Sequence, residues 1–402
     1  MRAALLVVAL VACVWGVLHV GWYDRAQIVD YGVYQEYGDA IANGHQVPYR
    51  DFEVEYPPAA LPVFVVPAYY EGFGYRTVFQ ALMAICLAAA ALGALSVGGL
   101  RAGVLTAVAP LALGSVVLSR FDLWPAALTV LALAALLRGR RGVSAILLGT
   151  AFAAKLWPAL LVPLLFVWLL RRAGRRAAAS WLLLAAATAA AWFLPFVVVS
   201  PGGVAHSFHA QLARPLQIES LGSAVLIAVH HIAGTSLHVV GSFGSQNVAG
   251  PGADAAAIAT TVAGGLALLA LYAAFARGDA AVGDLLRYCA AAVAIAIAFG
   301  KVFSPQFLIW LLPLVPLIRG RRGVYASATF AAALVLTQLW FPYHYWALAN
   351  GFALRESWEL LARDLLVVAL AGVLVWPRLQ HEVLGEHRSR LEALQRVRAQ
   401  VE

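Results

Sequence analysis

The chain has 402 residues, of which 62% are hydrophobic and only 12% charged; its mean hydropathy is +0.81 and its formal net charge is +8. A soluble domain is about half apolar and a quarter charged, so this composition excludes a soluble globular protein and predicts an integral membrane protein. The basic residues form short clusters between apolar segments instead of one patch with interleaved aromatic residues, which argues against nucleic-acid binding.

The apolar segments are about twenty residues long or somewhat shorter, which predicts an all-α polytopic fold. Placing every arginine cluster in the cytoplasm satisfies the positive-inside rule with a single topology, in which both termini are cytoplasmic. About twelve transmembrane helices are expected, some of them short, re-entrant or broken. Their ranges are 5–23, 75–97, 103–118, 123–137, 143–154, 156–170, 178–199, 255–276, 281–300, 307–318, 324–341 and 360–376.

These spans predict one transmembrane domain, 1–377, followed by a helical cytoplasmic tail, 378–402. Two long segments, 24–74 and 200–254, are expected outside the membrane, and the apolar stretch 221–232 should dip into it or lie flat. The first apolar segment has no small-residue cleavage pattern, so it is expected to be a retained anchor helix. The three cysteines fall inside predicted spans and suggest neither a disulfide framework nor a metal motif.

Eight of the chain's 20 acidic residues lie in the first outside segment: Asp24, Asp30, Glu36, Asp39, Asp51, Glu53, Glu55 and Glu71. A solvated loop explains most of them. Asp30 differs, because it follows the membrane edge closely and is flanked by Val29, Tyr31 and Tyr34. This apolar and aromatic setting suits a carboxylate held in a cleft.

Only two of the 28 basic residues are lysines, Lys155 and Lys301. Each is expected at the outer end of an outward-going span, with a proline (Pro158 or Pro305) shortly after it and then an inward-going apolar run. This similarity suggests a weak internal repeat. The lysines could simply reach the outer headgroups, but a charge between two short helices favours a binding role.

Other polar residues are expected at the same level. The short outside turn "LSRFDLWP" keeps Arg120 and Asp122 at the membrane edge, where they could pair or where the guanidinium could grip a phosphate. The stretch "ARPLQIESLGS" places Arg214, Gln217 and Glu219 just ahead of the apolar stretch 221–232. The outer histidines show no metal-ligand spacing, and no metal is predicted.

Several of these patterns together resemble the bacterial membrane glycosyltransferases of family 87, formerly a domain of unknown function, within the GT-C superfamily. They are "VDYGVY", "VPYRDFEVEYPPAALPVF", "RFDLWPAALTVLAL", "KLWPALLVPL", "QIESLGS" and "KVFSPQFLIWLLPL". The resemblance implies transfer of a sugar, mannose in the leading hypothesis, from a polyprenyl phosphate to a glycolipid or polysaccharide acceptor at the outer face of the plasma membrane. No cofactor and no nucleic-acid partner are implied.

The resemblance also implies roles for individual residues. Asp30 would be the general base, and Arg120, Lys155 and Lys301 would bind the donor phosphate. The sugar or acceptor site would be lined by Glu55, Tyr56, Asp122, Gln217, Glu219, Gln306 and His344. Tyr56 and the two prolines after it could instead only turn the chain back to the membrane.

Three alternatives remain at the level of sequence. An arabinofuranosyltransferase of the same family differs only in the sugar. A lipid or solute transporter or flippase would also show a dozen spans and buried lysines, but its polar residues should line the crossing path instead of gathering at the outer edge. A non-catalytic scaffold explains neither the lysines nor the acidic loop. The chain has no Gly-rich phosphate loop and no Asp-X-Asp pattern, so nothing points to a nucleotide-sugar donor.

Overall fold

The computed structural model describes residues 1–23 and 28–376 and shows a helical protein with a single two-stranded hairpin in that part of the chain. The α-helices are α1 Arg2–Leu18, α2 Tyr31–Ala42, α3 Leu61–Ala68, α4 Tyr75–Gly98, α5 Leu100–Val108, α6 Pro110–Leu113, α7 Val116–Ser119, α8 Leu123–Leu137, α9 Arg141–Ala154, α10 Val162–Val199, α11 Pro201–Ala213, α12 Leu221–Ala233, α13 Ala253–Arg277, α14 Val282–Ala298, α15 Gly320–Trp340, α16 Tyr345–Gly351 and α17 Leu354–Val375. Short 3₁₀ helices are η1 Pro58–Ala60, η2 Glu71–Phe73, η3 Trp157–Leu161, η4 Pro305–Leu311 and η5 Val315–Leu317, and the strands are β1 His238–Ser242 and β2 Ser245–Ala249.

The helical membrane fold predicted from the sequence is confirmed. Four helices are long and apolar enough to cross a bilayer, namely α4, the η3–α10 run, α13 and α15. Helix α8 has the predicted bounds, and the predicted spans 156–170 and 178–199 meet in α10, where Gly174 leaves the helical conformation (φ 84°). The count of about twelve crossings stays a prediction. The predicted tail helix lies outside the described residues, as does Asp24.

Two predicted spans are not continuous helices. The segment 103–118 is divided among α5, α6 and α7, because Pro110 starts α6 and Gly114 (φ 75°) ends it. The segment 307–318 is mostly 3₁₀ helix, since prolines at 305, 313 and 316 remove backbone donors at short intervals. Apolar length alone does not reveal these interruptions.

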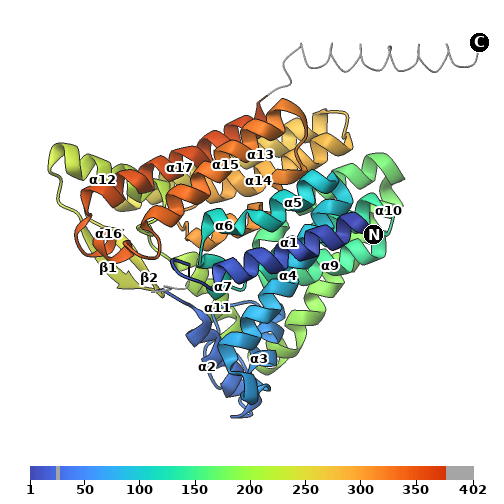
Figure 1. The fold of residues 1–402 in the computed structure, drawn as a ribbon, viewed down its shortest axis with the longest axis horizontal. Coiled ribbons are helices and arrows are strands. Elements are labelled where there is room, and N and C mark those ends of the chain that lie inside the picture. Colours follow the sequence, from blue (N-terminus) through green and yellow to red (C-terminus); the bar gives the residue numbers. More distant parts are fainter. Residues whose placement is uncertain (24–27, 377–402) are drawn as a thin grey trace, which may run out of the picture.

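Helix α8 lies at the centre of the packing, against α4 and α9, while α9 packs on α10 and α17 packs on α14 and α15. Nearly every α8 side chain is buried, and the small alanines along it allow the neighbouring helices to approach closely. Figure 1 shows α12, α13, α14, α15 and α17 side by side in one part of the molecule and α1, α4, α5 and α9 in the other.

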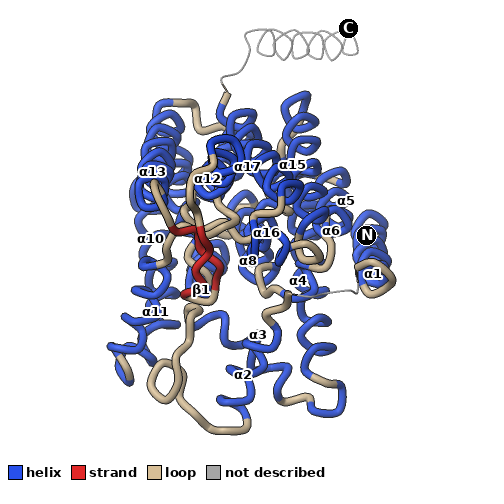
Figure 2. The backbone as a smooth tube through the Cα atoms, turned by 90° about the vertical axis from the view of Figure 1, so that its left-hand side faces the viewer, coloured by secondary structure: helices blue, strands red, loops and turns tan. Residues whose placement is uncertain are grey.

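The long outside segments contain structure that the sequence did not predict. Helices α2 and α3 form a projection at the bottom of Figure 1, and the hairpin stands at the front of Figure 2. The hairpin closes with two residues of positive φ, Phe243 and Gly244, as a type I′ turn requires. Its strand β2 also bonds the segment before α12, because Ile218 donates to Gln246 (3.0 Å) and Val248 donates to Leu216 (2.9 Å).

Candidate active site

Asp30 and Arg120 form an ion pair at the N-terminal end of α2. Arg120 comes from the turn between α7 and α8, and its side chain is 8% exposed, whereas that of Asp30 is 25% exposed. The Tyr34 hydroxyl, one helical turn after Asp30, donates to the same carboxylate at 3.4 Å. The Asp30 carboxylate therefore has a fixed position and remains accessible from the surface.

A second ion pair lies next to the first. The Lys155 ammonium is 2.6 Å from Asp122, and the Trp310 indole N–H donates to the same Asp122 oxygen, also at 2.6 Å. Lys155 also lies over the rings of Phe121 and Phe307. Asp122 is completely buried, and its charge acts on Arg120 as well, so it links the two pairs.

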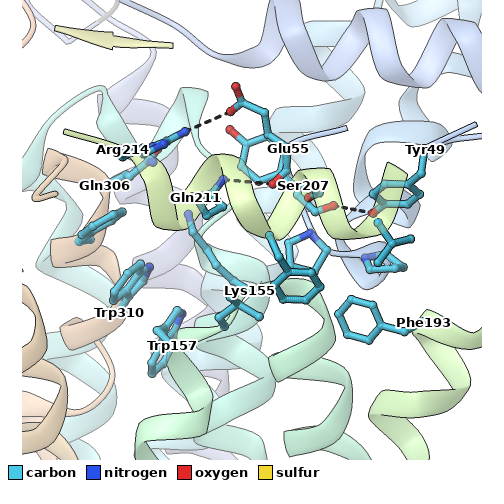
Figure 3. A pocket seen from close by; sticks show the side chains of 17 residues that line it. Tyr49, Glu55, Lys155, Trp157, Phe193, Ser207, Gln211, Arg214, Gln306 and Trp310 are labelled. Carbon is cyan, nitrogen blue, oxygen red and sulfur yellow. Dashed lines mark hydrogen bonds and ion pairs between the residues drawn. The ribbon is translucent and has the colours of Figure 1, made fainter. Parts of the chain in front are cut away.

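Lys155 opens onto a cavity of about 170 Å³. Figure 3 shows its side chain extending toward the wall that carries Gln211, Arg214 and Glu55, with Trp157, Trp310 and Gln306 along another side. Arg214 pairs with Glu55 at 3.2 Å, and the Trp157 and Trp310 rings stack at 5.3 Å. The full lining is Tyr49, Glu55, Tyr56, Pro57, Pro58, Lys155, Leu156, Trp157, Phe193, Val204, Ser207, Phe208, Gln211, Arg214, Gln306, Phe307 and Trp310.

Three buried polar atoms of residues that line this cavity have no hydrogen-bond partner in the described structure: Arg214 Nε, Gln306 Oε1 and Trp157 Nε1. Leaving such an atom unpaired costs about 1–3 kcal/mol, so three residues around this cavity carry polar groups without the partner that buried groups normally have. The two cations Lys155 and Arg214, the neutral acceptor Gln306 and the stacked indoles suit an anionic group attached to a sugar or an apolar chain.

Glu219 and Gln217 are polar residues near Arg120, whose charge acts on Glu219. Glu219 is 2% exposed, and its carboxylate accepts a hydrogen bond from the Gln217 amide. Burial raises the pKa of the Glu219 carboxyl to about 8, and the positive charges of Arg363 and Arg120 oppose this rise. Two arginines thus act on the Glu219 carboxyl through their charges.

The expected residues that line the cavity are Glu55, Tyr56, Lys155 and Gln306, whereas Asp30, Arg120, Asp122, Gln217 and Glu219 lie outside its lining. Lys301 and His344 do not line the cavity either. The Lys301 ammonium donates to the Leu212 carbonyl at the end of α11 (2.7 Å), and Lys301 does not line the cavity. Its backbone carbonyl accepts from the Gln217 N–H at 2.9 Å, so Lys301 joins two outside segments. His344 is exposed at the start of α16. Among residues 1–23 and 28–376, no group of three His, Cys, Asp or Glu side chains is arranged to hold a metal ion.

The sequence expectations omitted several residues of this site. Arg214 has no role in those expectations, and the stacked Trp157 and Trp310 are not among the expected site residues. Arg363 and Asp364 lie completely buried within α17, so the predicted span 360–376 carries a charged pair away from the residues expected at the site. An adjacent arginine and aspartate inside "LLARDLLVV" was the available signal.

Comparison with known proteins identifies the family. The profile of glycosyltransferase family 87 matches residues 55–305, which is more than half of the chain. The fold is similar to a crystal structure of ArnT from Cupriavidus metallidurans bound to undecaprenyl phosphate, with 18% identity, a TM-score of 0.50, and coverage of 92% of this chain and 77% of that one. The apo structure of the same protein gives 16% identity, a TM-score of 0.49, and coverage of 92% and 76%. No curated protein sequence matches significantly. The chain belongs to glycosyltransferase family 87 and is a multi-pass membrane glycosyltransferase of the GT-C fold.

Proposed function

We propose that the protein transfers mannose from a polyprenyl phosphate to a glycolipid or polysaccharide acceptor at the outer face of the plasma membrane. The observation that carries this proposal is the accessible Asp30 carboxylate, paired with Arg120, whose charge also acts on Lys155 in the lining of a cavity that contains cations and aromatic rings. The fold neighbour with bound undecaprenyl phosphate supports a lipid-phosphate donor. The choice of mannose rests on the sequence resemblance described above.

In this reaction Asp30 is the general base. Its carboxylate takes the proton of an acceptor hydroxyl as the hydroxyl oxygen attacks the anomeric carbon of the donor sugar. The new carbon–oxygen bond forms while the bond to the phosphate oxygen breaks, and the phosphate leaves on its polyprenyl chain. Arg120 beside Asp30 is positioned to stabilise the negative charge that develops on the leaving phosphate.

The cavity supplies the remaining donor contacts. Lys155 is already paired with Asp122, so its charge is largely balanced, whereas Arg214 has an unpaired Nε and a partner, Glu55, that is 40% exposed. We assign Arg214 to the donor phosphate together with Arg120 and Lys155. Gln306 and Tyr56 would contact sugar hydroxyls, and the stacked Trp157 and Trp310 would contact the first isoprene units.

The proposed orientation places this site outside the cell. The arginine clusters between spans would be cytoplasmic under the positive-inside rule, and both termini with them. Helices α2, α3 and α11 and the hairpin would then cover the outer membrane surface, where a lipid-linked donor and a glycan acceptor can meet.

The test is a transfer assay with purified protein in liposomes. Polyprenyl-phosphate mannose is expected to donate its sugar to a glycolipid acceptor, and Asp30→Asn should lower kcat by about 10²- to 10⁴-fold because the base is lost. Glu36→Gln, an exposed carboxyl on the same helix, is the matched control and should transfer at the wild-type rate.

The outcomes separate the alternatives. Transfer only from polyprenyl-phosphate arabinofuranose would replace mannose with arabinofuranose. Movement of labelled lipid between leaflets without any transfer would favour a flippase. An Asp30→Asn variant as active as wild type would remove Asp30 from the role of base.

A further inference from the structure

Helix α17 lies beyond the part of the chain that matches the family profile, and it carries a buried charge pair that the reaction described above does not use. Arg363 and Asp364 are both completely buried. Burying two ions is costly unless they are paired and hydrogen-bonded. The Arg363 Nε is 2.7 Å from Asp364, yet within the described structure both Asp364 oxygens and two of the three Arg363 nitrogens lack a hydrogen bond. The two charges therefore balance one another, but most of their hydrogen-bonding capacity is not used within the helix.

The remaining nitrogen of Arg363, Nη2, contacts the segment that carries Glu219. Its Nη2 donates to the Glu219 carbonyl at 2.7 Å, across a sequence separation of 144 residues. The guanidinium also lies on the Phe303 ring at 3.8 Å, just after Lys301. Arg363 thus joins α17 to both segments that border the site.

The Glu219 side chain interacts through its charge with both Arg363 and Arg120. Arg363 and Arg120 both act on its carboxylate with favourable charge, Asp364 acts on it with unfavourable charge, and the Tyr345 hydroxyl of α16 is within electrostatic reach. Arg120 in turn pairs with Asp30. The order from α17 to the proposed base is Arg363, Glu219, Arg120 and Asp30.

We propose that Arg363 is a positioning residue for sugar transfer: its hydrogen bond to the Glu219 carbonyl fixes Glu219, its charge favours the carboxylate form of Glu219, and that carboxylate favours the Arg120 guanidinium beside Asp30. This inference rests on the proposed function, because it takes the roles of Asp30 and Arg120 from it. It adds to that function that the rate of sugar transfer depends on Arg363 of α17.

The expected pH dependence follows from the Glu219 charge. The Glu219 pKa is raised to about 8, so the carboxylate form, and with it kcat/KM, increases as the pH rises through this value. Arg363→Gln removes a favourable charge, so the rise should move to higher pH, by on the order of one pH unit. At neutral pH this corresponds to about a tenfold loss of kcat/KM, which is recovered at high pH.

The neighbouring residue provides a control of opposite sign. Asp364→Asn removes a like charge from Glu219, so the same rise should move to lower pH. Glu219→Gln should abolish this part of the profile, and adding Arg363→Gln to it should then cause no further pH shift. Arg363→Lys keeps the charge and should stay near the wild-type profile. Arg355→Gln, exposed on the same helix, should leave the profile unchanged.

The experiment measures kcat/KM between about pH 6 and 10 in liposomes, on variants shown to be monodisperse with cooperative thermal unfolding. Shifts of opposite direction for the two α17 variants support the inference. Shifts in the same direction, or a loss of rate with an unmoved profile, overturn it in favour of a purely structural pair. If Arg363→Gln does not fold, Asp364→Asn and Arg363→Lys still test the sign. Wild-type protein that transfers no sugar from any donor would overturn the proposed function itself, a result distinct from an active enzyme with unshifted variants.

Discussion

At the scale of residues, the charged groups of the site occur in pairs whose members come from distant parts of the chain. Asp30 pairs with Arg120, Asp122 with Lys155, and Glu55 with Arg214. Each cation is thereby partly neutralised before substrate arrives. A leaving phosphate can replace a carboxylate partner most readily where that carboxylate is solvent-accessible, because its return to water costs little.

This reasoning separates Arg214 from Lys301. Arg214→Gln should raise the donor KM about tenfold, the effect of one lost hydrogen bond to a charged group. Lys301→Gln should leave the donor KM within about threefold of wild type and lower the apparent Tm instead, since its ammonium caps the α11 carbonyl end. Initial rates against donor concentration, with thermal unfolding in detergent, measure both effects. An equal rise of KM in both variants would return Lys301 to the phosphate site.

At the scale of elements, α2 positions Asp30 and α3 positions α2. Gly38 lies against the α3 backbone so closely that an added Cβ would be 2.3 Å from the Phe64 carbonyl oxygen. Tyr34 also stacks on the Phe64 ring, with ring centres 4.4 Å apart. The geometry of the proposed base therefore depends on this helix contact.

Gly38→Ala should push the two helices apart. The expected cost is about 1–3 kcal/mol of stability, together with a lower kcat because Asp30 moves relative to Arg120. Gly32→Ala on the same helix is the matched control, since its Cβ would meet nothing within 4 Å, and it should be neutral or stabilise by up to about 1 kcal/mol. Thermal unfolding and kcat for both variants provide the comparison. Equal behaviour of the two alanines would show that the contact does not constrain α2.

The elements also differ in how well their sequence predicted them. Helices α4 and α8 were predicted nearly to the residue, because each is an uninterrupted apolar run with clear ends. Helix α2 and the hairpin were missed, since they lie outside the apolar spans and contain no long hydrophobic stretch. The broken helices next to Asp122 and Lys155 contain prolines and glycines that reveal an interruption but not its shape.

At the scale of the whole molecule, the hairpin and α12 lie at one side of Figure 1 and the N-terminus at the other. The proposed topology assigns these two sides to the outside and the cytoplasm. In a cysteine-free background, Asn43→Cys on the exposed end of α2 should react with a membrane-impermeant maleimide in intact cells. Arg140→Cys, exposed between α8 and α9, should react only after permeabilisation. The reverse labelling pattern would invert the proposed orientation.

The sequence by itself determined the membrane class, most of the helices, the family and the short set of polar residues at one level. These properties depend on composition, apolar length and local motifs, which are readable along a single stretch of chain. Only the tertiary structure decided which of those residues meet. Arg214 lines the cavity and Lys301 does not, and Arg363 reaches the Glu219 carbonyl from another helix. The physical reason is that ion pairing inside a low-dielectric protein depends on separations of a few ångströms, which helix packing sets and local sequence does not.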